Sequence, residues 1–210
     1  MRVNRPIDQW LLGIDRGLKT MTGSLTTTER FQHNATNETL SDSTKASSAA
    51  LMRINHCGEV CAQGLYHGQA LSARRQSAKD HLLSAAGDEQ KHLIWCQERL
   101  KELGARTSYL NPLWYLSSFV TGAVTGLMGD KVSLGFVAAT EEEVCKHLDQ
   151  HLQKLPASDH RSREILEAIK ADEQHHQEDA QSHGGAEFPV FIKKMMTLSS
   201  KLMTRSTRWI

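Results

Sequence analysis

Two Glu-x-x-His motifs, each following a further glutamate at almost the same distance, constrain the fold of this chain more than any other feature. The separation is 30 residues in the first half (59 to 89) and 32 residues in the second (141 to 173). Residues three apart share one face of a helix, so each motif predicts a helix that presents both side chains together. The six residues concerned are Glu59, Glu89, His92, Glu141, Glu173 and His176.

The midpoint of each interval coincides with a turn signal. The first midpoint lies in the Arg-Arg-Gln segment 74–76, and the second lies in Pro156-Ala157-Ser158. Two antiparallel helices of equal length on either side of a turn bring the paired positions to the same height. Each half is therefore predicted to be a helical hairpin, and the chain holds this module twice.

The glutamates lie on apolar helix faces. Glu141 continues the series Leu134 and Val137 at helical spacing, whereas Glu142 and Glu143 are expected to point outward. Four carboxylates on apolar stripes would be strongly destabilising without partners. Two divalent or trivalent cations would neutralise them and accept two neutral imidazoles. Mixed carboxylate and imidazole ligands with open positions suit iron or manganese better than a structural zinc site.

Hydrophobic periodicity predicts helices and no strands, so we expect an all-α fold. The bundle domain is expected to cover 47–210, after an N-terminal amphipathic helix and polar linker in 1–46. Gly122, Gly126 and Gly129 indicate close helix packing by the apolar segment 112–129. The predicted helices of the bundle domain span 47–75, 78–103, 113–128, 131–154, 161–182 and 188–210. The apolar face of the N-terminal helix consists of Ile7, Trp10, Leu11, Ile14 and Leu18.

Composition excludes several classes of protein. With 25 basic and 24 acidic residues, the formal net charge of +1 argues against nucleic acid as a partner bound by bulk charge. The four cysteines include no Cys-x-x-Cys spacing, which excludes rubredoxin-type and zinc-ribbon sites. They are expected to be reduced, buried residues of a protein in a reducing compartment.

The segment 188–210 is both basic and amphipathic. It contains five basic residues and no acidic one. The pattern is typical of a helix lying on a membrane surface, although docking of the apolar face on the core fits it equally well. Its apolar face consists of Phe191, Met195, Leu198, Leu202 and Trp209. The apolar segment 112–129 is shorter than the roughly 20 residues that a membrane-spanning helix needs.

The sequence around the motifs resembles the demethoxyubiquinone hydroxylases (Coq7 family). The resemblance covers about residues 50 to 205, in order and with matching spacing. The segments that carry it are Ile54-Asn55-His56-Cys57-Gly58-Glu59-Val60, Asp88-Glu89-Gln90-Lys91-His92-Leu93, Pro112-Leu113-Trp114, Ala139-Thr140-Glu141-Glu142 and Asp172-Glu173-Gln174-His175-His176.

This resemblance implies a ferritin-like antiparallel four-helix bundle with additional membrane-facing helices. It implies a carboxylate-bridged centre of two iron ions per chain, held by the six residues of the repeated module. The implied reaction is an O₂-dependent hydroxylation of the demethoxyubiquinol ring in ubiquinone biosynthesis. Its substrate carries a polyprenyl tail, and other ubiquinone-biosynthesis proteins are candidate partners. No Gly-x-Gly-x-x-Gly follows a strand, so electrons are expected from NADH held in another way or from a separate reductase.

One position departs from the family pattern. Where many relatives have His-His-Tyr, this chain has Lys146-His147-Leu148. His147 keeps an imidazole that could orient a ligand or relay an electron, but the phenol is missing at Leu148. Asn55 and Tyr66 share the helical face of Glu59 and are expected either to hydrogen-bond its carboxylate or to line the pocket. The remaining histidines are expected at the surface or around the site.

Two other functions stay open on the residues alone. A ferritin-type iron-oxidising or storage protein would use the same ligands, but the apolar segment and the basic C-terminal helix disfavour its soluble, cage-forming exterior. A non-enzymatic membrane lipid-binding scaffold would explain the amphipathic helices but not six phased ligands. Because no cleavable presequence is recognisable, we expect a peripheral protein on the cytoplasmic face of a bacterial inner membrane. The sequence leaves a homo-oligomer open.

Overall fold

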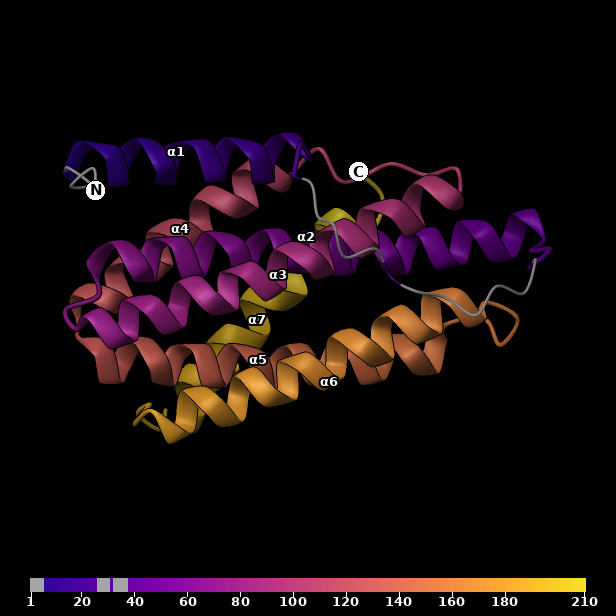
Figure 1. Cartoon of the computed structure of the whole chain (residues 1–210). Helices are drawn as coiled ribbons and strands as arrows, with labels where there is room; N and C mark the ends of the chain where they lie inside the picture. Colours follow the sequence, from indigo (N-terminus) through magenta and orange to yellow (C-terminus); the bar gives the residue numbers. More distant parts are fainter. Residues whose placement is uncertain (1–5, 26–30, 32–37) are drawn as a thin grey trace.

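The computed structural model describes residues 6–25, 31 and 38–210, with no strand among them, which confirms the all-α class (Figure 1). In the N-terminal helix, no side chain is described for residues 6–12 and 14, so most of its predicted apolar face lies outside the described residues. The helices are α1 (Pro6–Thr22), α2 (Asp42–Ser72), α3 (Gln76–Glu102), α4 (Asn111–Leu127), α5 (Asp130–Lys154), α6 (His160–Ser182) and α7 (Val190–Thr207).

Four of these helices form the predicted antiparallel bundle. α2 and α3 make one hairpin, and α5 and α6 make the other, with the long axes of the four nearly parallel (Figure 1). The two turns lie at residues 73–75 and 155–159, which confirms both predicted turns. Asp159 caps α6, since its side chain accepts a hydrogen bond from the backbone N–H of Ser162. The architecture is that of a ferritin-like bundle.

The start of α2 and the exposure of Leu18 differ from the predictions. α2 begins at Asp42, five residues before the predicted start, because the Ser41 hydroxyl accepts a hydrogen bond from the backbone N–H of Thr44 and caps the helix there. The polar linker is correspondingly shorter, and its residues 26–30 and 32–37 lie outside the described part of the chain. Leu18, expected on the apolar face of α1, is exposed.

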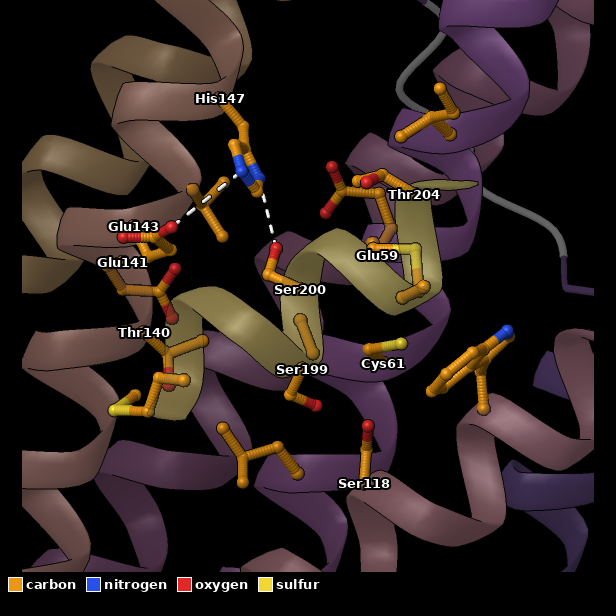
Figure 2. Close-up of a pocket in the computed structure, with 18 of the residues that line it drawn as sticks. Glu59, Cys61, Ser118, Thr140, Glu141, Glu143, His147, Ser199, Ser200 and Thr204 are labelled. Carbon is orange, nitrogen blue, oxygen red and sulfur yellow. Dashed lines mark hydrogen bonds and ion pairs between the residues drawn. The ribbon is translucent and has the colours of Figure 1, made fainter. Parts of the chain in front are cut away.

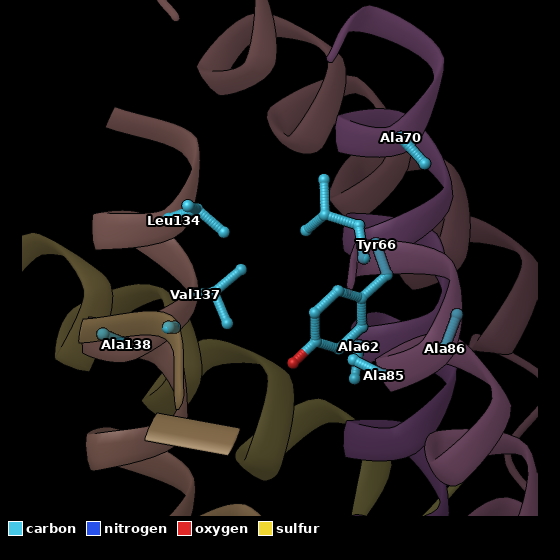
Figure 3. Close-up of a cluster of buried hydrophobic side chains, with 10 residues drawn as sticks. Ala62, Tyr66, Ala70, Ala85, Ala86, Leu134, Val137 and Ala138 are labelled. Carbon is cyan, nitrogen blue, oxygen red and sulfur yellow. The ribbon is translucent and has the colours of Figure 1, made fainter. Parts of the chain in front are cut away.

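The described core contains three apolar clusters, and the two larger ones lie within the four-helix bundle. One contains Ala62, Tyr66, Leu82, Leu134 and Val137 (Figure 3), and the other contains Met52, Cys96, Leu148, Leu166 and Ile169. On each bundle helix the glutamates and histidines of the repeated module lie between residues of the first cluster and residues of the second. The polar residues therefore form a layer across the bundle, sealed from water at both ends by apolar side chains.

α4 packs on α2 through facing glycines, as predicted from Gly122 and Gly126. Gly129 takes no part in this contact, because a methyl group there meets no atom within 4 Å, and it lies instead at the start of α5 with a φ of +116°. A methyl group added at Gly68 or Gly122 would lie less than 3.0 Å from backbone atoms of the opposite helix. The two backbones are in direct contact along this seam, because no side chain separates them. α7 crosses α2 and α5 outside the bundle.

Candidate metal centre

All six residues of the repeated module are buried, each with at most 8% of its surface exposed. α2 supplies Glu59 and α5 supplies Glu141, while α3 and α6 each supply one Glu-x-x-His motif. Four of them, Glu59, Glu89, His92 and Glu173, offer ligand atoms that lie within 4.8 Å of one another. The two halves of the chain thus meet at one depth in the bundle.

Glu89 and Glu173 each face both histidines. Nδ1 of His92 lies 3.4 Å from Oε2 of Glu89 and 3.3 Å from Oε1 of Glu173. Nδ1 of His176 lies 3.2 Å from Oε1 of Glu89 and 3.3 Å from Oε2 of Glu173. Each carboxylate therefore directs one oxygen toward each imidazole, which is the arrangement of two carboxylates that bridge a pair of cations.

The remaining two glutamates, Glu59 and Glu141, lie beside Glu89 and Glu173 respectively. Oε2 of Glu59 lies 3.9 Å from Nδ1 of His92. Oε1 of Glu141 accepts a hydrogen bond of 2.7 Å from the Tyr66 hydroxyl. This bond corrects one prediction, because Tyr66 contacts the glutamate of the opposite hairpin and not Glu59. Two turns separate Tyr66 from Glu59 along α2, so its phenol extends across the bundle to α5.

Buried polar atoms that lack hydrogen-bond partners indicate that cations fit among these six residues. Within the described chain, both carboxylate oxygens of Glu89 and Nδ1 of His92 are buried without a hydrogen-bond partner. Buried polar atoms normally have partners, and exceptions require an explanation such as an ion. Four carboxylates and two imidazoles converging in a dry layer supply the ligand types that iron and manganese prefer. The residues fit a two-cation centre.

Without bound cations, protons on the glutamates and histidines would have to balance the buried negative charge. Burial, followed by repulsion from Glu89 and Glu173, raises the pKa of Glu59 well above its usual range. Burial and the charge of Glu173 do the same to the pKa of Glu141. Burial opposes a charged imidazole, but contacts with Glu173 and Glu89 raise the pKa of His176 to about 11. Bound metal therefore competes with protons for this cluster.

A cavity of about 470 Å³ leads from the glutamates toward α4 and α7. Glu59 and Glu141 line it on the bundle side (Figure 2), together with Glu173. The opposite walls carry apolar side chains together with hydroxyls, among them Ser118 of α4 and Ser199 of α7. Its size is that of a small-molecule site.

Comparison with known proteins places this architecture in a family. The family model described as "Ubiquinone biosynthesis protein COQ7" matches residues 46–207. The chain belongs to the COQ7 family. Three similar curated relatives are each named "3-demethoxyubiquinol 3-hydroxylase". The relative from Chromohalobacter salexigens is 54% identical over 80% of this chain and 78% of its own length. The one from Nitrosococcus oceani is 48% identical over 97% and 96%, and the one from Acinetobacter baumannii is 47% identical over the full length of both.

Two aspartates of this COQ7-family chain, not predicted as site residues, contact the histidines of the motifs. Nε2 of His92 lies 2.9 Å from Oδ2 of Asp172, and Nε2 of His176 lies 3.5 Å from Oδ2 of Asp88. Each aspartate directly precedes the glutamate of one motif and supports the histidine of the other. The signal was visible as Asp-Glu-x-x-His, which occurs in both halves. A carboxylate on the far imidazole nitrogen fixes the ring and raises its basicity as a ligand.

Replacing Asp172 by alanine is expected to weaken metal binding by about 10- to 100-fold, because His92 would lose the partner that orients its ring. The same change at Asp88 should have a smaller effect, since its contact is longer. Metal-competition titrations with a chelator measure both affinities. Glu178→Ala, at an exposed position of α6, is the matched control. An Asp172→Ala protein with wild-type affinity would contradict the assigned role.

Other predicted residues lie around the cavity rather than at the carboxylates. Nδ1 of His147 is 3.1 Å from the Ser200 hydroxyl, and its Nε2 is 3.7 Å from Glu143 (Figure 2). Glu143 was expected to point outward but is partly buried in the cavity wall, where it pairs with His147. Leu148 is buried in the second apolar cluster and also reaches the cavity wall. Leu148 therefore packs among apolar side chains, where the hydroxyl of a tyrosine would need a hydrogen-bond partner.

Asn55 lies where one of the two predicted alternatives placed it, whereas His56 differs from its prediction. Asn55 was expected to contact Glu59 or to line the pocket, and it lines the cavity without bonding that carboxylate. Its amide donates to the Leu51 carbonyl, and its Oδ1 lies 2.9 Å from Nδ1 of His151 on α5. His56 is buried, with no partner for Nε2 among the described residues, because α4 covers it. Three histidines, His160, His175 and His183, are exposed as predicted.

The buried His56 predicts a loss of stability in acid. Burial lowers its pKa to about 4, whereas the unfolded chain has the ordinary value of about 6.5. Between these values the unfolded state binds the additional proton, so stability falls as the pH decreases through this window. His56→Gln should reduce the difference in unfolding free energy between pH 7 and pH 5 by about 2 kcal/mol. Chemical denaturation at both pH values measures it, with His160→Gln as the exposed control.

Proposed function

We propose that this chain is an O₂-dependent di-iron monooxygenase that hydroxylates the ring of demethoxyubiquinol in ubiquinone biosynthesis. The observation that carries the proposal is the pair Glu89 and Glu173, each facing both histidines at the inner end of a ligand-sized cavity. The curated relatives named 3-demethoxyubiquinol 3-hydroxylase support the choice of substrate. We take the bundle domain as residues 47–210 and the N-terminal segment as 1–46.

The metal ligands in this proposal are the six residues of the repeated module. Bound iron supplies the activation of O₂ that ring hydroxylation requires. The protein supplies the positions of the ligands: Tyr66 holds Glu141, Asp172 holds His92, and the two apolar clusters exclude water. An external reductant, either NADH or a reductase, provides the electrons. His147, at the cavity wall, is the candidate residue for relaying these electrons to the site.

The cavity would hold the quinol ring against Glu59 and Glu141. Its walls of Ala62, Leu65 and Met196 suit a substituted ring, while Ser118 and Ser200 can hydrogen-bond ring oxygens. The polyprenyl tail would leave between α4 and α7, which form the outer walls. Both helices also present apolar side chains to solvent, including Leu116 and Val120 on α4, so the tail meets apolar surface outside the cavity.

The exposed apolar faces favour association with a membrane surface. On α7 the outward residues are accompanied by the basic side chains of Lys194, Lys201, Arg205 and Arg208. This combination binds anionic lipid headgroups while burying apolar area. Among the described residues, no helix is both long and apolar enough to cross a bilayer. We propose a peripheral location on the cytoplasmic face of a bacterial inner membrane, with other ubiquinone-biosynthesis proteins or a second copy of the chain as candidate partners.

Replacing Phe191, Leu198 and Leu202 together by serine is expected to reduce binding to anionic liposomes by about 100-fold or more. These side chains are more than 60% exposed and lie outside the cavity lining, so the change removes membrane contact without altering the site. Each buried apolar side chain contributes roughly 1.5–3 kcal/mol. Liposome flotation measures the effect, with unchanged iron content as the control. Undiminished binding would overturn the membrane role of α7.

Product analysis in a strain lacking its own hydroxylase tests the proposed function. Expression of this chain should convert accumulated demethoxyubiquinone to the hydroxylated product, detected by mass spectrometry. Metal and lipid analysis of the purified protein separates the rivals. Two irons per chain with a prenylated quinone supports the hydroxylase, many irons without lipid supports storage, and lipid without metal supports a scaffold.

A further inference from the structure

A second group of metal-binding side chains lies at the end of the bundle, outside the buried layer. His81 is on the second turn of α3, Asp179 is on the last turn of α6, and His183 is the residue that ends α6. Each offers one ligand atom, and these atoms lie within 4.8 Å of one another. Nδ1 of His81 is 3.0 Å from Oδ2 of Asp179, and Nδ1 of His183 is 3.4 Å from Oδ1.

The local backbone holds these three side chains together. The N–H of His183 bonds the Asp179 carbonyl, and the N–H of Gly185 bonds the Ala180 carbonyl. Gly184 has a φ of +87°, a left-handed conformation that favours glycine and reverses the chain directly after His183. The imidazoles of His81 and His183 consequently stack with their centroids 4.9 Å apart and their planes 25° from parallel.

The chemistry of this group differs from that of the buried centre. Two imidazoles and one carboxylate are the ligands that Zn²⁺ and neighbouring divalent transition metals accept, with water in the remaining position. The side chains are 14% exposed at His81, 35% at Asp179 and 51% at His183, so an ion and its water ligand can enter from solvent. Burial lowers the pKa of His81 and favours the neutral, metal-binding form of its imidazole.

We propose that His81, Asp179 and His183 form a second metal site, which binds one divalent transition-metal ion of the Zn²⁺ class. His81 precedes Glu89 by eight residues, which places the site about 12 Å along α3 from the buried carboxylates. The ion joins α3 to α6, the two helices that carry the Glu-x-x-His motifs. The ion replaces the imidazole protons that face Asp179 and so links the N-terminal end of α3 to the C-terminal end of α6. This site does not depend on the reaction proposed above.

Zinc titration of the iron-loaded full-length chain tests the second site. Isothermal calorimetry should show about one zinc ion per chain, with the iron content unchanged after the titration. His81→Ala and His183→Ala should each weaken zinc binding by about 10-fold or more, and the double variant should lose the site. His160→Ala and His175→Ala remove exposed histidines elsewhere on the surface and should bind zinc like the wild type.

Two further measurements distinguish the loss of the zinc site from misfolding of the variants. Zinc should raise the thermal midpoint of the wild-type protein but not that of the double variant, whose helicity should match the wild type without zinc. X-ray absorption at the zinc edge should show two imidazole ligands. Wild-type zinc stoichiometry in the double variant, or zinc bound only as iron is displaced, would overturn the proposal.

Discussion

Glu173→Gln protein is expected to retain at most one iron ion per chain and to lose hydroxylation by about three orders of magnitude or more. Such a loss corresponds to about 4 kcal/mol of activation free energy. The reason is geometric, because Oε1 of Glu173 faces His92 while Oε2 faces His176. An amide nitrogen cannot act as the second anionic oxygen, so one change affects both cation positions. Iron analysis and single-turnover product formation measure the two losses.

The stability of the metal-free protein separates this effect from misfolding. Glu173 is buried among Glu59, Glu89 and Glu141, and removing one carboxylate from the group reduces the number of charges or protons that the empty site must accommodate. Metal-free Glu173→Gln should therefore be at least as stable as the metal-free wild type. Glu167→Gln, at an exposed position on the same helix, should keep both irons and full activity. A glutamine variant that retained two irons would refute the bridging role.

Gly68→Ala is expected to lower the thermal midpoint by roughly 6–12 °C. The added methyl would lie less than 3.0 Å from backbone atoms of Phe119 and Ala123, and backbone cannot rotate away as a side chain can. Forcing the helices apart costs about 3 kcal/mol, and each kcal/mol shifts the midpoint of a chain this size by about 2–4 °C. Differential scanning calorimetry measures the change.

Gly87→Ala is the matched control for this substitution. Gly87 is also a helix-interior glycine, but a methyl group there meets no atom within 4 Å. Because alanine is the better helix former, this variant should be more stable than the wild type by about 0.5–1 kcal/mol. If Gly68→Ala were stabilised like Gly87→Ala, helix propensity would outweigh the α2–α4 contact, and the close packing inferred at Gly68 would be refuted.

The sequence predicted the bundle and its buried layer because both depend on spacing. The separation of Glu59 from Glu89 and of Glu141 from Glu173 defines the register of each hairpin, and the apolar stripes define the inward face. Burial of all six residues followed from those two patterns. The cap at Ser41 is the kind of local signal that a search for apolar periodicity overlooks, and it moved the start of α2.

The spacing of residues along the sequence does not predict which side chains of one hairpin contact the other. Tyr66 and Glu59 share a helical face, yet the phenol extends to Glu141 on another helix. His56 has the sequence context of a surface residue, yet it is buried beside Asn111 at the start of α4. The C-terminal helix was also only partly predictable: Met196 and Ser200 line the cavity, while the predicted apolar face, including Leu198, is exposed and not docked on the core.

The crossed support of the histidines has a consequence for assembly. Asp172 of the second hairpin holds His92 of the first, and the first hairpin reciprocates through Asp88 and His176. In the proposed di-iron centre, neither hairpin alone would supply all the ligands or their supporting aspartates. Binding of both metal ions would then require the two hairpins to dock in the correct register, and a chain with misaligned halves would not bind them.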